Sequence, residues 1–356
     1  MSHHDTLSQL GWQAFFQQQL DLDEYDTALP YRVLEQHRSQ LILAGEAGNY
    51  TLDILPNMPE MVVGDWLLLD QQFNFVRLLQ RKTCFARKAA GSQVKTQLIS
   101  SNVDTAFIVS SMNDDFNLNR IERFLALVNE AQAEPVVLLS KSDQATDPQR
   151  YIDQVRSLSP LLMIEAVNCL DPLALNQLSP WLKLGHTLAV LGSSGVGKST
   201  LVNTLLGLAV NSSEAQSTGG IREDDAKGRH TTTRRSLIVL PQNDTHQGGL
   251  ILDTPGMREL QLANSEEGIH HTFADIEALS QHCRFNDCQH QDEPGCAVKQ
   301  ALADGELDVR RLKNYQKLLR ENALNSASLA QKRANDKALG KYYKTTQGEA
   351  SKLKGR

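Results

Sequence analysis

A short glycine-rich segment, GSSGVGKST at residues 192–200, has the residue types and spacing needed to hold phosphate. It follows the apolar stretch TLAVL and precedes a helical pattern, which is the strand–loop–helix context of a P-loop. Glycines let backbone N–H groups turn toward phosphate oxygens, Lys198 adds a cation at the β- and γ-phosphates, and the Ser199 hydroxyl is a ligand for Mg²⁺. The positions expected to contact nucleotide are Gly192, Ser193, Ser194, Gly195, Val196, Gly197, Lys198, Ser199 and Thr200.

The segment Ser140-Lys141-Ser142-Asp143 indicates that the bound base is guanine. A carboxylate at Asp143 accepts hydrogen bonds from guanine N1–H and N2–H₂, whereas adenine offers neither donor in that geometry. Ser140 stands where such loops carry Asn. We therefore expect the loss of an amide contact to the base and to a neighbouring loop, with weaker binding and retained selectivity. The segment at 166–169 falls where a last guanine-loop motif would lie, and only its position supports that role.

A third segment, GLILDTPG, ends an apolar strand with the spacing Asp253-x-x-Gly256. In switch GTPases an Asp in this arrangement reaches the Mg²⁺ shell and a Gly N–H senses the γ-phosphate. In ordinary small GTPases the P-loop comes first in the chain, but here the base-reading segment at 140–143 precedes the P-loop at 192–200. The order of the motifs therefore predicts a circularly permuted GTPase domain.

Three of the five cysteines crowd one short segment, which indicates a metal site. Cys283, Cys288, His290 and Cys296 offer three soft thiolates and one imidazole, enough to close a tetrahedral Zn²⁺ site, with His282 as a competing ligand. Four protein ligands imply a structural metal. Zinc binding would supply much of the stability of a segment with so few apolar residues.

The bulk properties are those of a protein without membrane spans. Hydrophobic residues make up 40% and charged residues 22% of the 356 residues, and no run of about 18 apolar residues could cross a bilayer. The N-terminus MSHHDTLSQLGWQAFF has no basic start followed by an apolar stretch, which argues against secretion. We expect a cytoplasmic monomer with reduced cysteines and no membrane partner.

The C-terminal end carries a basic arm. From Arg310 onward, thirteen Lys or Arg residues stand against Glu321, Asp336 and Glu349, so this arm is near +10 although the whole chain is −6. Such an arm suits the phosphate backbone of RNA.

The elements that must position these motifs divide the chain into four parts and predict a multidomain α/β protein. Residues 1–30 are an N-terminal extension containing one short amphipathic helix packed on its own protein. Residues 31–98 hold five short strands, which favours a small β-barrel of the OB-fold type. Residues 99–262 alternate apolar strands with helices, as in a parallel α/β sheet. Residues 263–356 form a helical zinc-binding domain and basic tail.

The motifs together resemble the ribosome small-subunit-dependent GTPase A family, RsgA. The resemblance rests on the permuted order, FNLNRIERFLALVNEAQAEPVVLLSKSD, GSSGVGKSTLVN, REDDAKGRHTTT, LDTPGMREL and the Cys/His cluster, and covers about residues 31–320. It implies an OB-fold, a permuted GTPase domain and a zinc domain acting in late maturation of the small ribosomal subunit. Ser140 and the N-terminal extension leave open that the chain is a divergent paralogue.

The resemblance also implies the catalytic residues. Met257 occupies the position where Ras-like enzymes carry a water-orienting Gln, so another group must position water. The family places His230 in switch I and associates it with catalysis beside Lys198, and Thr231 or Thr232 should reach Mg²⁺.

Three functions remain open from the sequence. The favoured one is GTP hydrolysis to GDP and phosphate, stimulated by the small ribosomal subunit and its rRNA. The others are a P-loop ATPase or kinase, and a nucleotide-gated RNA-binding scaffold with negligible turnover.

Overall fold

The computed structural model describes residues 6–88, 96–208, 235–242, 247–253, 265–291 and 293–326. The chain divides into two compact units. The first comprises Met1–Ala86, Leu98–Leu260 and Glu267–Ala274, and the second comprises Arg87–Gln97, Gln261–Glu266 and Asp275–Arg356. No helix in the described ranges is both long and apolar enough to cross a membrane.

The first unit is built on a mixed sheet that holds the predicted nucleotide-binding motifs. Its strands are β8 (Thr105–Ser111), β9 (Glu134–Ser140), β10 (Met163–Val167), β11 (Thr187–Leu191), β12 (Arg235–Leu240) and β13 (Gly249–Asp253). They lie in the order β10-β9-β8-β11-β13-β12. All pair in parallel except β12, which runs antiparallel to β13. Every residue of β8 is buried, as expected for a central strand covered on both faces.

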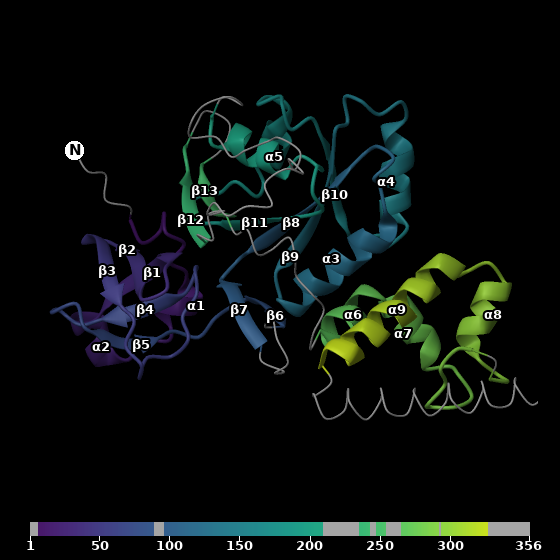
Figure 1. The fold of residues 1–356 in the computed structure, drawn as a ribbon, viewed down its shortest axis with the longest axis horizontal. Coiled ribbons are helices and arrows are strands. Elements are labelled where there is room, and N and C mark those ends of the chain that lie inside the picture. Colours follow the sequence, from purple (N-terminus) through teal and green to yellow (C-terminus); the bar gives the residue numbers. More distant parts are fainter. Residues whose placement is uncertain are drawn as a thin grey trace, which may run out of the picture. The chain divides into compact units, whose positions relative to one another are not determined.

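Helices cover this sheet on both faces (Figure 1). They are α3 (Leu118–Glu130), α4 (Pro148–Arg156) and α5 (Lys198–Leu205), with a 3₁₀ turn at η1 (Ala174–Leu178). Alternate residues Phe107 and Val109 of β8 share a core cluster with Leu201 and Leu205 of α5, while α3 contacts β8 and β9. Because successive strand residues face opposite sides, the same strand supports both layers.

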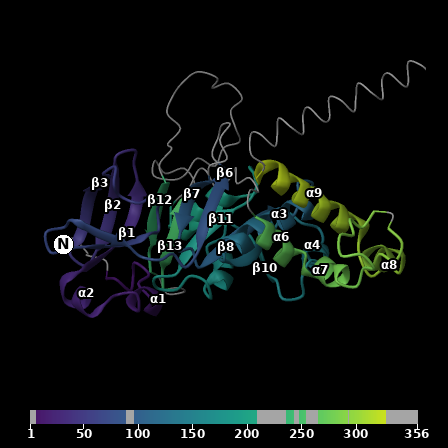
Figure 2. The ribbon, with the colours of Figure 1, turned by 90° about the horizontal axis from the view of Figure 1, so that it is seen from below.

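The five strands predicted for the N-terminal barrel are present. They are β1 (Leu29–Gln36), β2 (Gln40–Gly45), β3 (Gly48–Asp53), β4 (Trp66–Leu69) and β5 (Phe75–Leu78). β1 pairs with both β2 and β4, and β5 pairs with β4. β1 also pairs antiparallel with β12, through Glu35↔Ser236 and Gln36↔Arg235, so β1, β2 and β3 continue the nucleotide-binding sheet, as Figure 2 shows.

The N-terminal extension packs on its own protein, as expected, but it contains two short helices where we predicted one. They are α1 (Ala14–Gln17) and α2 (Leu22–Thr27). The two helices are separate because Asp21 and Glu24 form a capping box, which begins α2 as a new helix. Leu10 and Phe16 are buried with Trp66 of the barrel in one core cluster.

Two further structural features were not predicted. Strand β12 was missed, and so was a two-stranded sheet formed by β6 (Cys84–Lys88) and β7 (Thr96–Ser101). After residue 265 the described part of the chain contains only helices, as predicted. These are α6 (Glu266–Thr272), α7 (Ala274–Ser280), α8 (Ala297–Ala303) and α9 (Val309–Ser326).

A buried arginine joins three segments of the first unit. Arg32 is 1% exposed, and its guanidinium donates to the carbonyl oxygens of Leu10 (2.5 Å), Asn102 (3.0 Å) and Gly64 (3.4 Å). Burial lowers the pKa of Arg32 to about 10, against the raising effect of nearby carboxylates, so the side chain is still a cation at neutral pH. The extension, the barrel and the start of the nucleotide-binding domain therefore share one donor.

We expect Arg32→Met to lower the free energy of unfolding by about 3 kcal/mol, because it leaves buried carbonyl groups without a donor. Urea unfolding of the whole chain measures this. The matched control is Arg38→Met, which alters an exposed arginine. Equal stability of the two variants would show that the buried contacts contribute nothing.

Candidate nucleotide site and metal centre

The predicted P-loop joins β11 to α5 at the carboxyl end of the sheet. Three of its residues, Gly192, Gly195 and Gly197, adopt positive φ angles that favour glycine. At Gly192 (φ +142°) a β-carbon would lie 2.3 Å from the carbonyl oxygen of Val109, and Gly197 adopts φ +98° immediately before α5. The loop thus turns closely over β8 and ends at a helix N-terminus, where backbone N–H groups favour an anion.

Lys198 lies inside this loop. Its side chain is buried, and its ammonium group donates to the carbonyl oxygen of Ser193. The positive charge therefore lies against the backbone of the predicted P-loop.

Ser140 ends β9 and contacts the P-loop directly. Its hydroxyl group is buried and donates to the carbonyl oxygen of Val196 at 2.5 Å. A hydroxyl contact with the neighbouring loop is therefore present where we expected an amide contact to be lost. The two loops approach closely enough for a hydroxyl to suffice, since a β-carbon on Gly197 would lie 3.8 Å from Ser140 Oγ.

The remaining residues of the base-reading segment lie beside the segment at 166–169. Ser142 N–H donates to Val167 at 3.4 Å, and Thr204 Oγ1 of α5 donates to the carbonyl of Cys169 at 2.7 Å. Burial, followed by the nearby charge of Asp143, raises the pKa of Cys169 to about 12. Asp143 itself is exposed, while Lys141 adopts φ +58°. The fold thus brings the two predicted guanine segments together.

The switch residues are placed only in part. β13 ends at Asp253, whose backbone pairs with Ser236 of β12 while β13 runs parallel to the P-loop strand. The Asp253 side chain and four other predicted residues lie outside the described residues. These four are Gly256, His230, Thr231 and Thr232.

One contact at the P-loop was not predicted. Arg120 Nη1, in the first turn of α3, donates to Ser193 Oγ at 2.8 Å. The sequence does carry a signal for it. A cation in the first turn of a helix is disfavoured by the helix dipole, so Arg120 at this position indicates a partner elsewhere.

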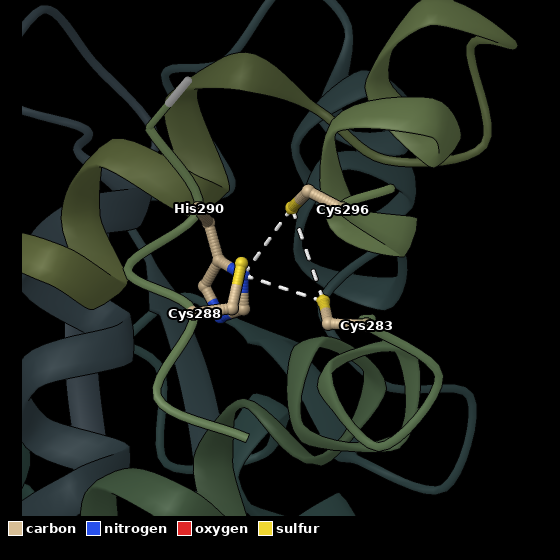
Figure 3. Close-up of side chains that lie close together, drawn as sticks. All are labelled: Cys283, Cys288, His290 and Cys296. Atoms are coloured by element: carbon tan, nitrogen blue, oxygen red, sulfur yellow. Dashed lines mark hydrogen bonds between the residues drawn. The ribbon is translucent and has the colours of Figure 1, made fainter. Parts of the chain in front are cut away.

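The four predicted metal ligands converge in the second unit (Figure 3). His290 Nδ1 lies 3.7 Å from Cys283 Sγ and 3.5 Å from Cys296 Sγ, and one ligand atom from each of the four residues, Cys288 included, lies within 4.8 Å of the others. A tetrahedral zinc site with bonds of about 2.0 to 2.3 Å places its ligand atoms about 3.5 Å apart, so the group is compatible with zinc. His282 is not part of it.

His290 is held in the state that binds metal. Burial lowers its imidazole pKa, which favours the neutral ring. Ser280 Oγ donates to the carbonyl of Ile276 at 2.8 Å and lies 3.0 Å from His290 Nε2. With the hydroxyl proton donated to Ile276, this geometry favours the tautomer in which Nε2 carries the ring proton and Nδ1 keeps its lone pair for a metal.

Comparison with known proteins identifies the family. The RsgA GTPase family model matches residues 78–263. The small ribosomal subunit biogenesis GTPase RsgA 2 of Vibrio vulnificus is 55% identical over 349 residues, covering 98% of this chain and 97% of the relative. The corresponding RsgA of Mesorhizobium japonicum is 45% identical over 324 residues, covering 90% of this chain and 91% of the relative. The chain belongs to the RsgA GTPase family.

Solved structures agree with this RsgA fold. YjeQ from Thermotoga maritima has a TM-score of 0.59 at 24% identity and covers 83% of this chain and 98% of its own. YloQ, described as a circularly permuted GTPase, has a TM-score of 0.57 at 22% identity, with 84% and 96% covered. The predicted fold class is confirmed. RsgA membership makes the chain a GTP hydrolase, which excludes the ATPase alternative.

We expect Ser140→Ala to weaken GTP binding about tenfold, since it leaves the carbonyl of Val196 without its donor and loosens the P-loop. Titration with a fluorescent guanine nucleotide measures the affinity. Ser157→Ala, at the end of α4, is the matched control. An unchanged affinity in Ser140→Ala would mean that the link does not support binding.

Proposed function

We propose that this RsgA family member binds GTP at residues 192–200 and hydrolyses it in the course of small ribosomal subunit maturation. The observation that carries the proposal is the hydrogen bond from Ser140 to the P-loop, which joins the base-reading segment to the phosphate-binding segment. The relatives named above are small ribosomal subunit biogenesis GTPases, and their alignments cover 98% and 90% of this chain.

The roles within the nucleotide site follow from chemistry. Asp143 reads the guanine edge, Lys198 stabilises the β- and γ-phosphates, and Ser199 binds Mg²⁺ together with Asp253. The exposure of Asp143 supports its role, because a base can reach it. His230 positions the attacking water, Thr231 or Thr232 completes the Mg²⁺ shell, and Gly256 senses the γ-phosphate.

The ribosomal partner is bound through rRNA by the C-terminal domain. Arg310, Lys313, Lys317 and Arg320 recur at three- and four-residue intervals along α9 and therefore lie on one helical face. Lys313, Lys317 and Arg320 are exposed. Such a row of cations matches the spacing of charges on an RNA backbone. We propose that the protein works as a monomer in the cytoplasm, the compartment that contains ribosomal subunits.

Zinc is proposed as the structural metal of this domain. Cys283, Cys288, His290 and Cys296 would hold it, and neutralisation of the thiolates would stabilise the loop between α7 and α8. α7 is fixed to α9 by the ion pair between Arg311 and Asp275, at 2.6 Å. Metal binding at one end of α7 therefore supports the basic helix as well.

We expect small ribosomal subunits to raise GTP turnover by about tenfold or more, and His230→Ala to lose most of that stimulated rate while still binding GTP. The reason is that Met257 cannot orient water and His230 can. Phosphate release is measured with small subunits, large subunits and neither. Equal rates in all three would contradict the ribosomal assignment. Stimulation that survives in His230→Ala would reject only that residue.

Elemental analysis should find one zinc per chain, lost in Cys288→Ser because a thiolate ligand is removed. Ser280→Ala should weaken zinc binding about tenfold, since the imidazole loses the contact that fixes its tautomer. Competition with a chromophoric chelator measures the affinity, and Cys84→Ser is the matched control. Native protein without zinc would contradict the proposed site.

A further inference from the structure

A single guanidinium connects the start of α3 to the P-loop. Arg120 donates to the carboxylate of Asp115 at 2.6 and 3.2 Å, to the carbonyl of Asp115 at 2.7 Å, and to Ser193 Oγ at 2.8 Å. The Asp115 contacts leave the guanidinium little freedom to turn away from the loop.

The placement of this cation is electrostatically unfavourable in itself. Arg120 is the third residue of α3, where the helix dipole disfavours positive charge. The opposing P-loop adds the N-terminus of α5 and the Lys198 ammonium group. Asp115 offsets part of this repulsion. A cation held against such a field points to a role at the loop, because helix stability alone would favour an acidic residue here.

Ser193 is bound at both its side chain and its backbone. Its hydroxyl group is held by Arg120, and its carbonyl oxygen accepts from the ammonium group of Lys198. A backbone rotation at Ser193 would therefore move the carbonyl oxygen that accepts from the Lys198 ammonium group.

We propose that Arg120 is a positioning residue for GTP hydrolysis: through Ser193 it holds the P-loop in the conformation that directs Lys198 toward the β- and γ-phosphates. The inference rests on the proposed nucleotide site and extends it to a residue outside the motif. Only arginine fits, because its planar fork binds Asp115 through two nitrogens while a further N–H reaches Ser193.

This contact complements the one from Ser140. Ser140 fixes the loop near its end, at Val196, and Arg120 fixes it near its start, at Ser193. The loop is thus held at two points by elements that precede it in the permuted chain.

The test is a double-mutant cycle with Arg120→Ala, Ser193→Ala and the pair, measuring dissociation constants for GTP and GDP. Each single change should weaken GTP binding about tenfold and GDP binding less, because Lys198 reaches both the β- and γ-phosphates of GTP. The double variant should be no weaker than either single one, since both remove the same contact. Arg120→Lys should behave like Arg120→Ala.

Arg150→Ala, at an exposed position on α4, is the matched control and should leave both affinities unchanged. Three outcomes would each overturn the proposal. They are additive losses of GTP affinity in the double variant, equal losses of affinity for GTP and GDP, and an undiminished GTP affinity. Ser193→Ala removes one hydroxyl from a partly exposed loop, so it keeps the test valid if Arg120→Ala unfolds.

Lys198→Ala separates this inference from the assignment of the site. If Lys198→Ala abolishes GTP binding while Arg120→Ala has no effect, the role of Arg120 is rejected and the site stands. If Lys198→Ala binds GTP normally, the nucleotide site is misassigned and the role of Arg120 falls with it.

Discussion

The hydrogen bond from the Ser140 hydroxyl to the Val196 carbonyl is the contact on which the nucleotide site depends. It links a segment that follows β9 to a loop that follows β11, although the permuted chain places the first well before the second. The link is possible because β9, β8 and β11 run in parallel and release their loops at one edge of the sheet. The order of strands in the sheet, and not their order in the chain, assembles the site.

The same sheet connects nucleotide binding to the barrel. β12 pairs with β13 on one side and with β1 on the other, and it follows directly after the segment predicted to contain switch I. Any shift of β12 must therefore be accommodated by β1. Arg32 of β1 in turn binds Leu10 of the N-terminal extension and Asn102, the residue that follows β7. Backbone pairing thus makes the barrel a structural neighbour of β12.

The second unit depends on a different kind of constraint. Its Cys/His loop has few apolar side chains, and its four ligand atoms lie within 4.8 Å of one another. α7 supplies Ser280 to His290 and contacts α9 through Asp275 and Arg311. The short helix α7 therefore links the metal ligand His290 and its tautomer to the packing of α9.

The sequence by itself determined the P-loop, the metal-ligand spacing, the permuted order and the five barrel strands, because each depends on residues that are close together in the chain. Only the tertiary structure decided the contacts of Ser140, Arg120 and Ser280, and the pairing of β12 with β1. The link from Ser140 to Val196 spans 56 positions and that from Arg120 to Ser193 spans 73. Hydrogen bonds over such separations leave no periodicity in the sequence, since they exist only when the sheet brings distant loops to one edge.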